Sequence, residues 1–284
     1  MTRQPTSLTL MRGAFGLLSR TVPDVASLVA ADLFMKPRKF AAPDRERAIL
    51  AEATEFEVLL GTNIRLQAWR WGRGPAVLLV HGWEGRGSQL APFVRPLVES
   101  GHSVITFDAP GHGASSGKRS SLPHFAYAVR GVAAAIAPPY AIVAHSLGCA
   151  ATTLALRDGL TAQRLVFISP PLNPSDYVNR FGEILGVSGP VLDRMKLRIE
   201  ERFLRKWSDY SLEETAREMK APLLVVHDRD DVETFHSEGE ALAKAWPEAR
   251  MISTSGLGHR RILRDENVIA AATRFITAPS PADA

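Results

Sequence analysis

Residues 142–150 read IVAHSLGCA, and they place Ser146 directly after an apolar run and directly before a small-residue segment typical of a helix. A serine hydroxyl is a poor nucleophile at neutral pH, so it needs a general base, and that base needs an acid to orient it. Later segments supply both residue types. LLVVHDRDD ends in Asp228, Asp230 and Asp231, and STSGLGHRRILRD contains His259. These residue types could supply a nucleophile, a general base and an orienting acid.

The surroundings of Ser146 strengthen this interpretation. A strand that turns at once into a helix passes through a strained residue, and small neighbours let the chain segments pack closely. Ala144 and Gly148 stand two positions on either side of the serine. We expect the serine side chain to lie at the end of a sheet, beside a helix N-terminus whose dipole favours developing negative charge.

The elements that must position these residues alternate along the chain. From residue 55 onward, short β-rich runs alternate with longer helical stretches. The segments 55–60 and 63–71, separated by Gly61-Thr62, are typical of an antiparallel hairpin. Six nearly continuous apolar runs follow, at 76–81, 103–107, 141–145, 164–169, 222–227 and 250–254. This pattern predicts a doubly wound α/β sheet with helices on both faces.

One spacing breaks the alternation. Residues 172–220 form an insert about twice as long as a single crossover helix requires, with helix-like segments at 175–186 and 191–207. It follows the carboxyl end of a strand, where open α/β sheets bind ligands, so we predict a helical cap insert over a site. The alternative is an enlarged crossover without contact to substrate. Five basic residues of its second helix favour either a solvated face or an acidic substrate: Arg194, Lys196, Arg198, Arg202 and Arg205.

These predicted elements also divide the chain into segments. Residues 55–171 and 221–277 form the expected core, residues 1–54 an N-terminal helical segment packed on it, and residues 278–284 a disordered tail. Residues 8–20 are expected to form an amphipathic helix on the domain. A peripheral membrane contact through this helix is the alternative. Arg12 interrupts its apolar residues, and the chain has no run of roughly 18 apolar residues that would span a membrane.

Composition limits the partners. The 284 residues carry a net charge of +4, and the 34 basic and 30 acidic side chains are interspersed, which argues against nucleic acid as a partner. A single cysteine, Cys149, excludes an intramolecular disulfide and is compatible with a reducing compartment, so we expect a cytoplasmic protein. We interpret Cys149 as a small buried side chain. Histidine pairs with metal-ligand spacing are absent, so we expect no metal and no cofactor.

Four segments in order resemble the α/β-hydrolase superfamily. AHSLG matches its G-x-S-x-G nucleophile elbow, with Ala144 replacing the first glycine, and HGWEGRG at 81–87 resembles its H-G-x oxyanion loop. FDAPGHGASSG at 107–117 resembles its D-x-P-G-x-G-x-S loop, whose role is structural. The later order of Asp and then His completes the pattern. The resemblance covers residues 55–275 and implies an α/β-hydrolase fold, with a mostly parallel eight-stranded sheet flanked by helices.

The resemblance also implies a role for each residue. Ser146 would be the nucleophile, His259 the base and Asp231 the orienting acid, because the family's acid stands three residues after the position that closes the strand. Asp228 occupies that closing position and is expected to brace the turn, while Asp230 is expected to face solvent. Either remains an alternative acid.

Two backbone N–H groups would form the oxyanion hole, those of Leu147 and Trp83. His81 and Gly82 are expected to shape the turn before Trp83, with no catalytic role for His81.

The implied function is a serine hydrolase that cleaves a small-molecule carboxylic ester through an acyl-enzyme. Thioesterase, lipase, lactone, carbon–carbon and peptide hydrolysis remain alternatives, and a non-catalytic ligand-binding protein is the rival from another class. Serine at the elbow argues against dehalogenase and epoxide hydrolase chemistry, which use aspartate there. The sequence gives no indication of the oligomeric state.

Overall fold

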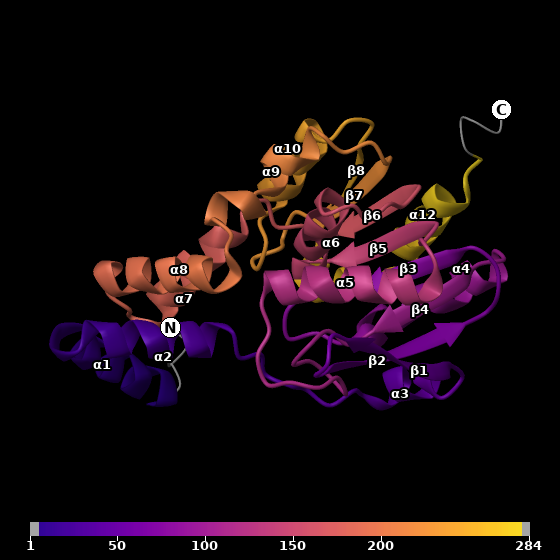
Figure 1. The fold of residues 1–284 in the computed structure, drawn as a ribbon. Coiled ribbons are helices and arrows are strands. Elements are labelled where there is room, and N and C mark those ends of the chain that lie inside the picture. The colour runs from indigo at the N-terminus through magenta and orange to yellow at the C-terminus, as the bar shows by residue number, and fades with distance from the viewer. Residues whose placement is uncertain (1–5, 280–284) are drawn as a thin grey trace. The chain divides into compact units, whose positions relative to one another are not determined.

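The computed structural model describes residues 6–279, which form two compact units (Figure 1). The larger unit comprises residues 37–172 and 212–279, and the smaller comprises residues 6–36 and 173–211. Each has a hydrophobic core of its own.

One eight-stranded sheet organises the larger unit, in the order β1-β2-β4-β3-β5-β6-β7-β8. The hairpin of β1 and β2 is antiparallel, β2 pairs antiparallel with β4, and all other neighbours are parallel. The predicted mostly parallel eight-stranded sheet is therefore confirmed. The strands are β1 (Thr54–Leu60), β2 (Ile64–Trp71), β3 (Ala76–Val80), β4 (Ser103–Phe107), β5 (Ala141–His145), β6 (Arg164–Ile168), β7 (Leu223–Asp228) and β8 (Arg250–Thr254).

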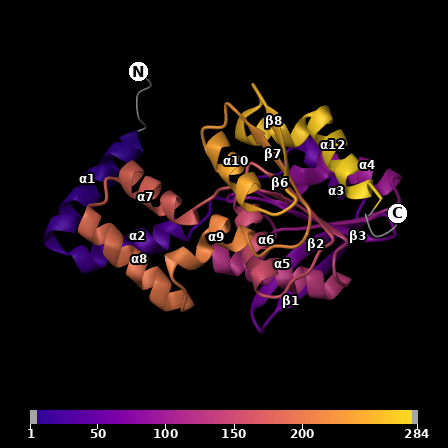
Figure 2. The same ribbon diagram turned by 90° about the horizontal axis from the view of Figure 1, so that it is seen from above.

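Helices cover both faces of this sheet, which explains why β4 to β7 are buried along their whole length (Figure 2). One face packs on η1 (Gly87–Phe93), α4 (Val94–Glu99), η3 (Ile262–Arg264) and α12 (Glu266–Thr277) through a single apolar cluster. The other face carries α5 (Leu122–Ile136), α6 (Leu147–Arg157) and α10 (His236–Ala245). Three shorter helices complete the unit: α3 (Asp44–Leu50), α9 (Leu212–Ala216) and α11 (Gly258–Arg261).

The register of the parallel strands fixes where the candidate residues lie. His145 pairs with Ile168 at the ends of β5 and β6, and Asp228 pairs with Thr254 at the ends of β7 and β8. The carboxyl ends of parallel strands share one edge of the sheet. The loops that carry Ser146, Asp231 and His259 therefore begin at the same edge.

The smaller unit is helical and consists of α1 (Thr6–Thr21), α2 (Pro23–Phe34), α7 (Pro174–Leu185), α8 (Gly189–Phe203) and η2 (Trp207–Tyr210). The two helices of the predicted insert are α7 and α8, and the helix expected at 8–20 lies within α1. Their common core contains Phe15, Ala30, Val178 and Met195, and the ring of Phe34 packs edge-on against Phe181 at 5.3 Å.

Two expected boundaries differ from the structure. We expected residues 1–54 to pack on the core, but residues 6–36 group with the insert helices, and only residues 37–54 belong to the sheet unit. The small residues Ala26 and Ala30 are fully buried, and α2 makes its main helix contacts with α8. The insert itself closes at residue 212 rather than 220, because the N–H of Leu212 donates to the carbonyl of Leu172 at 3.0 Å.

The C-terminal end begins as an ordered segment. The guanidinium of Arg164 donates to the carbonyls of Phe275, Ala278 and Pro279, so the first two residues of the expected tail are held on the core. The rest of that tail, residues 280–284, lies outside the described residues. Among residues 6–279, no helix is both long enough and apolar enough to cross a membrane.

Candidate active site

Ser146 lies at the sharp turn between β5 and α6, with φ 53° and ψ −124°. Few non-glycine residues adopt a positive φ, and such strain persists where the surrounding structure enforces it. The Ser146 N–H donates to the carbonyl of Ile168 at 3.0 Å, and the side chain is half-buried. A Cβ at Gly148 would lie 2.6 Å from the carbonyl oxygens of Val80 and His81, so only glycine allows this close approach.

Asp231 and His259 meet in the structure. His259 is the second residue of α11, the helix that follows β8, and its Nδ1 lies 2.8 Å from Oδ2 of Asp231. The other carboxylate oxygen, Oδ1, accepts hydrogen bonds from the N–H groups of Glu233 and Thr234. An acceptor at Nδ1 keeps the proton on that nitrogen, which leaves the Nε2 lone pair free to accept a proton.

The Asp231 carboxyl is ionised at neutral pH. Burial alone would raise its pKa, but the imidazoles of His227 and His259 and the N–H of Thr234 hold the pKa below its ordinary value. His227 Nε2 lies 3.6 Å from Oδ2 of Asp231. Asp231 therefore presents a negative charge to His259, as an orienting acid must.

The two neighbouring aspartates serve the loops instead. Asp228 accepts hydrogen bonds from the N–H groups of Leu257 and Gly258 and from the hydroxyl of Thr254, so it braces the loop that carries His259, as expected. Asp230 is exposed, as expected, and accepts from the N–H of Gly256. Neither is bonded to the His259 imidazole in the described structure.

His145 connects the serine turn to the His259 loop, a role that the sequence did not indicate. Its Nε2 lies 2.9 Å from the carbonyl oxygen of His259, and the two rings are 4.6 Å apart between centroids. Burial holds the pKa of His145 well below its ordinary value, so the ring is neutral at pH 7. Because His145 immediately precedes Ser146, this contact brings the His259 backbone next to the serine turn.

The segment 81–87 lies against the same turn. A Cβ at Gly82 would lie 2.9 Å from the Cβ of Ser146, so glycine permits the backbone to approach the serine. His81 is fully buried, and its Nδ1 donates to the carbonyl of Gly82 while its Nε2 accepts from the N–H of Ala109. Burial lowers the pKa of His81 to about 4, so it is a neutral brace of the turn, as expected.

The backbone N–H groups of Trp83 and Leu147 belong to the residues that follow Gly82 and Ser146. Within residues 6–279, neither N–H has a hydrogen-bond acceptor, so both are free to bind an oxygen of a ligand. The indole of Trp83 packs edge-on against the ring of His112, with 5.2 Å between the ring centroids. This contact holds Trp83, and therefore its N–H group, in place.

Two ion pairs join the segment 81–87 to residues earlier in the chain, and neither could be predicted from the sequence. Arg38 donates to both carboxylate oxygens of Glu84, a residue with φ 54°, and Arg86 does the same with the buried Glu46. Ser88 also donates to Glu46. Bidentate pairs of this kind fix geometry as well as charge.

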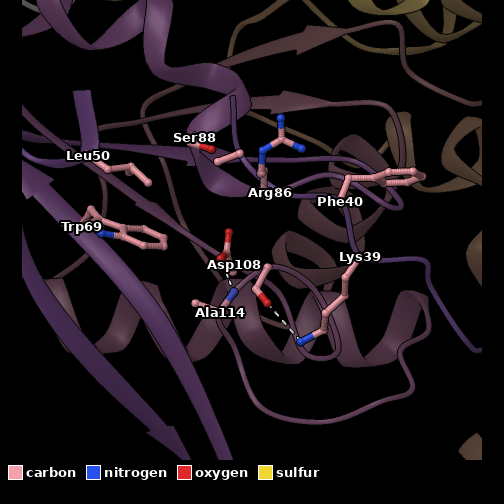
Figure 3. A pocket seen from close by; sticks show the side chains of 11 residues that line it. Lys39, Phe40, Leu50, Trp69, Arg86, Ser88, Asp108 and Ala114 are labelled. Atoms are coloured by element: carbon pink, nitrogen blue, oxygen red, sulfur yellow. Dashed lines mark hydrogen bonds between the residues drawn. The ribbon is translucent and has the colours of Figure 1, made fainter. Parts of the chain in front are cut away.

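The segment 107–117 supports these elements. Asp108 accepts from the N–H groups of Gly87 and Ala114, so it ties the two loops together. Beside it lies a cavity of about 360 Å³ lined in part by Lys39, Trp69 and Arg86 (Figure 3). Its lining does not include Ser146, Asp231 or His259.

No described group of three or more His, Cys, Asp or Glu side chains is arranged as metal ligands. Cys149 is buried, and its thiol donates to the carbonyl of Ala144 at 3.2 Å. Burial raises the pKa of this thiol well above its ordinary value, so it stays protonated.

Residues 74–257 match the family model described as serine aminopeptidase, S33. The chain belongs to this family of α/β-hydrolases. Among curated proteins, this α/β-hydrolase is 37% identical over 79 residues to a pimeloyl-[acyl-carrier protein] methyl ester esterase of Xylella fastidiosa, across 27% of this chain and 29% of that protein. A similar match to the enzyme of that name from Stenotrophomonas maltophilia strain K279a is 38% identical over 77 residues, with the same coverage. The chain thus aligns with less than a third of the length of these relatives.

Several solved structures have a fold similar to that of this α/β-hydrolase. A bromoperoxidase from Bacillus anthracis superposes with a TM-score of 0.62 at 16% identity, covering 80% of this chain and 100% of that one. The Pyrococcus furiosus esterase Pf2001 superposes with a TM-score of 0.65 at 16% identity, covering 84% and 98%. At these identities the likeness shows the fold alone.

Proposed function

We propose that this α/β-hydrolase is a serine hydrolase that cleaves a small-molecule carboxylic ester with Ser146, His259 and Asp231. The observation that carries the proposal is the bonded pair of His259 Nδ1 and Asp231 Oδ2 at 2.8 Å, beside the turn that bears Ser146. A bonded acid and base next to a strained serine is the arrangement that activates a hydroxyl.

The chemistry would proceed in two steps. The Ser146 oxygen bonds to the carbonyl carbon while its proton passes to Nε2 of His259, and the N–H groups of Trp83 and Leu147 bind the oxyanion. The bond to the leaving alcohol then breaks, and the alcohol takes the proton from His259. In the second step a water molecule gives its proton to His259 and attacks the acyl carbon. Collapse of that adduct releases the acid and returns the proton to Ser146.

Asp231 would orient His259 for this proton transfer. Its charge would stabilise the imidazolium that forms during attack, and its bond to Nδ1 would keep Nε2 as the nitrogen that takes the serine proton. Two oxyanion donors would each contribute roughly 3 kcal/mol to transition-state stabilisation.

An ester is the proposed substrate rather than an amide. The curated relatives with the matching segment are named as methyl ester esterases, whereas the family model carries the name of a serine aminopeptidase. Those names describe other proteins, so the choice of bond needs a direct test.

Matched substrates provide this test. We expect hydrolysis of p-nitrophenyl esters from acetate to palmitate, with a larger kcat/KM for the best ester than for aminoacyl p-nitroanilides. Esters have the better leaving group, because an alkoxide or phenolate leaves a tetrahedral intermediate more readily than an amine does. A thioester of the same acyl group measures the alternative bond. Faster turnover of the anilides, or no turnover of any ester, would contradict the assignment.

A further inference from the structure

Thr234 lies next to the bonded pair, three residues after Asp231, and is 1% exposed. Its hydroxyl oxygen is 3.0 Å from Oδ2 of Asp231 and 3.2 Å from Nδ1 of His259. Because those two atoms are themselves 2.8 Å apart, the three polar atoms form a nearly equilateral triangle.

The direction of the hydroxyl proton follows from the acceptors around it. Oδ2 of Asp231 is charged and lies at 3.0 Å, whereas the carbonyl oxygen of Ser169 is neutral and lies at 3.3 Å. The shorter and charged acceptor makes the stronger bond, so the hydroxyl donates to Oδ2. Its lone pairs then face the N–H of His259.

His227 closes the far side of this cluster. Its Nε2 donates to the carbonyl of Thr234 at 3.0 Å, and it lies 3.4 Å from the Thr234 hydroxyl. The other nitrogen, Nδ1, is buried and has no partner within the described residues, which places the proton on Nε2. His227 therefore cannot take over the donation to Oδ2 without leaving the Thr234 carbonyl.

We infer that Thr234 is a positioning residue for the Asp231–His259 pair. Its hydroxyl fixes the rotation of the Asp231 carboxylate and holds the Nδ1–H of His259 on Oδ2, so the ring keeps one orientation and Nε2 remains the nitrogen that would take the proton of Ser146. The inference rests on the function proposed above. It adds to that function a residue that does not touch substrate and that acts through His259.

The position of the His259 ring matters because proton transfer tolerates little misalignment of its donor and acceptor. Oδ1 is held by two backbone N–H groups, whereas the donors within 3.2 Å of Oδ2 in the described part of the chain are the His259 imidazole and this hydroxyl, and Nε2 of His227 lies farther away at 3.6 Å. In a water-excluded site each bond of such a cluster strengthens the others. Loss of the hydroxyl lets the ring tilt, and a displacement of about 1 Å can cost roughly a hundredfold in rate.

The test compares Thr234→Val with Thr234→Ser. Valine keeps the shape and the backbone bonds but removes the hydroxyl, and serine restores the hydroxyl. We expect Thr234→Val to lower kcat for ester hydrolysis by roughly tenfold to a hundredfold with KM little changed. Thr234→Ser should recover most of kcat. Thr153→Val is the matched control, since the one hydrogen bond of that buried hydroxyl within residues 6–279 goes to the carbonyl of Cys149 on its own helix.

Proton NMR gives a readout that a merely structural role would not move. The wild-type protein should show a low-field Nδ1–H resonance that is absent from His259→Ala. That resonance should shift or broaden in Thr234→Val and return in Thr234→Ser. Thr234→Ala serves as a second hydroxyl-free variant if valine lowers the thermal unfolding temperature.

The two proposals fail in distinguishable ways. Full turnover by Ser146→Ala would overturn the proposed function. Loss of turnover in Ser146→Ala, together with wild-type kcat and an unchanged low-field resonance in folded Thr234→Val or Thr234→Ala, would overturn the inference on Thr234 alone.

Discussion

Ser146→Ala is expected to lower kcat for ester hydrolysis by about 10⁶-fold, because the acyl-enzyme can no longer form. KM should change little, since the side chain contributes to the transition state rather than to substrate binding. Steady-state kinetics on the best p-nitrophenyl ester measure both parameters.

Ser120→Ala is the matched control for this substitution. Ser120 is fully buried, and its hydroxyl has no partner among the described residues, so its loss should leave turnover unchanged. If Ser146→Ala retained a substantial fraction of wild-type kcat while folded, the nucleophile would have to be another group.

Asp231→Asn should lower kcat by about 10⁴-fold near neutral pH. An amide no longer supplies the negative charge that stabilises the imidazolium. Its NH₂ group can also turn toward Nδ1 and reverse the His259 tautomer. The pH–rate profile measured between pH 6 and 10, where the wild-type carboxylate stays ionised, reports this loss.

Asp230→Asn separates this effect from a general loss of acidic charge in the loop. Asp230 is exposed and contacts only the N–H of Gly256 with its side chain among the bonds described, so we expect near wild-type kcat. A large loss of kcat in Asp230→Asn with little loss in Asp231→Asn would show that Asp230, and not Asp231, is the orienting acid.

The sheet could be predicted from the sequence because its signal is local. Apolar runs such as 141–145 and 222–227 are buried on both sides in parallel strands, and the loops after them carry polar residues at one edge. The adjacency of Asp231 and His259 followed from a family pattern of motifs in order. Neither the 2.8 Å distance nor the supporting N–H groups can be read from linear spacing.

The pairing of distant helices could not be predicted. Nothing in residues 8–34 indicates that α2 packs on α8 rather than on the sheet, because an amphipathic face fits any apolar partner. The ion pair of Glu46 and Arg86 and the contact of His145 with the His259 carbonyl are also long-range. Their residues are ordinary in type, and only the folded chain brings them together.

Thr234 illustrates the same limit inside the candidate site. A threonine three residues after an aspartate is a common feature of a turn, so its position in the sequence indicates no role in the site. The loop geometry turns its hydroxyl back toward Oδ2 of Asp231 and the ring of His259.

The most direct test of the account is covalent labelling with a fluorophosphonate, which reacts with an activated serine hydroxyl. Intact-mass spectrometry at neutral pH should show one adduct per chain, and peptide mapping should place it on Ser146. The adduct should be absent from Ser146→Ala and strongly slowed in His259→Ala. Folded wild-type protein that is never labelled, or that is labelled at another residue, would contradict the assignment of Ser146 as an activated nucleophile.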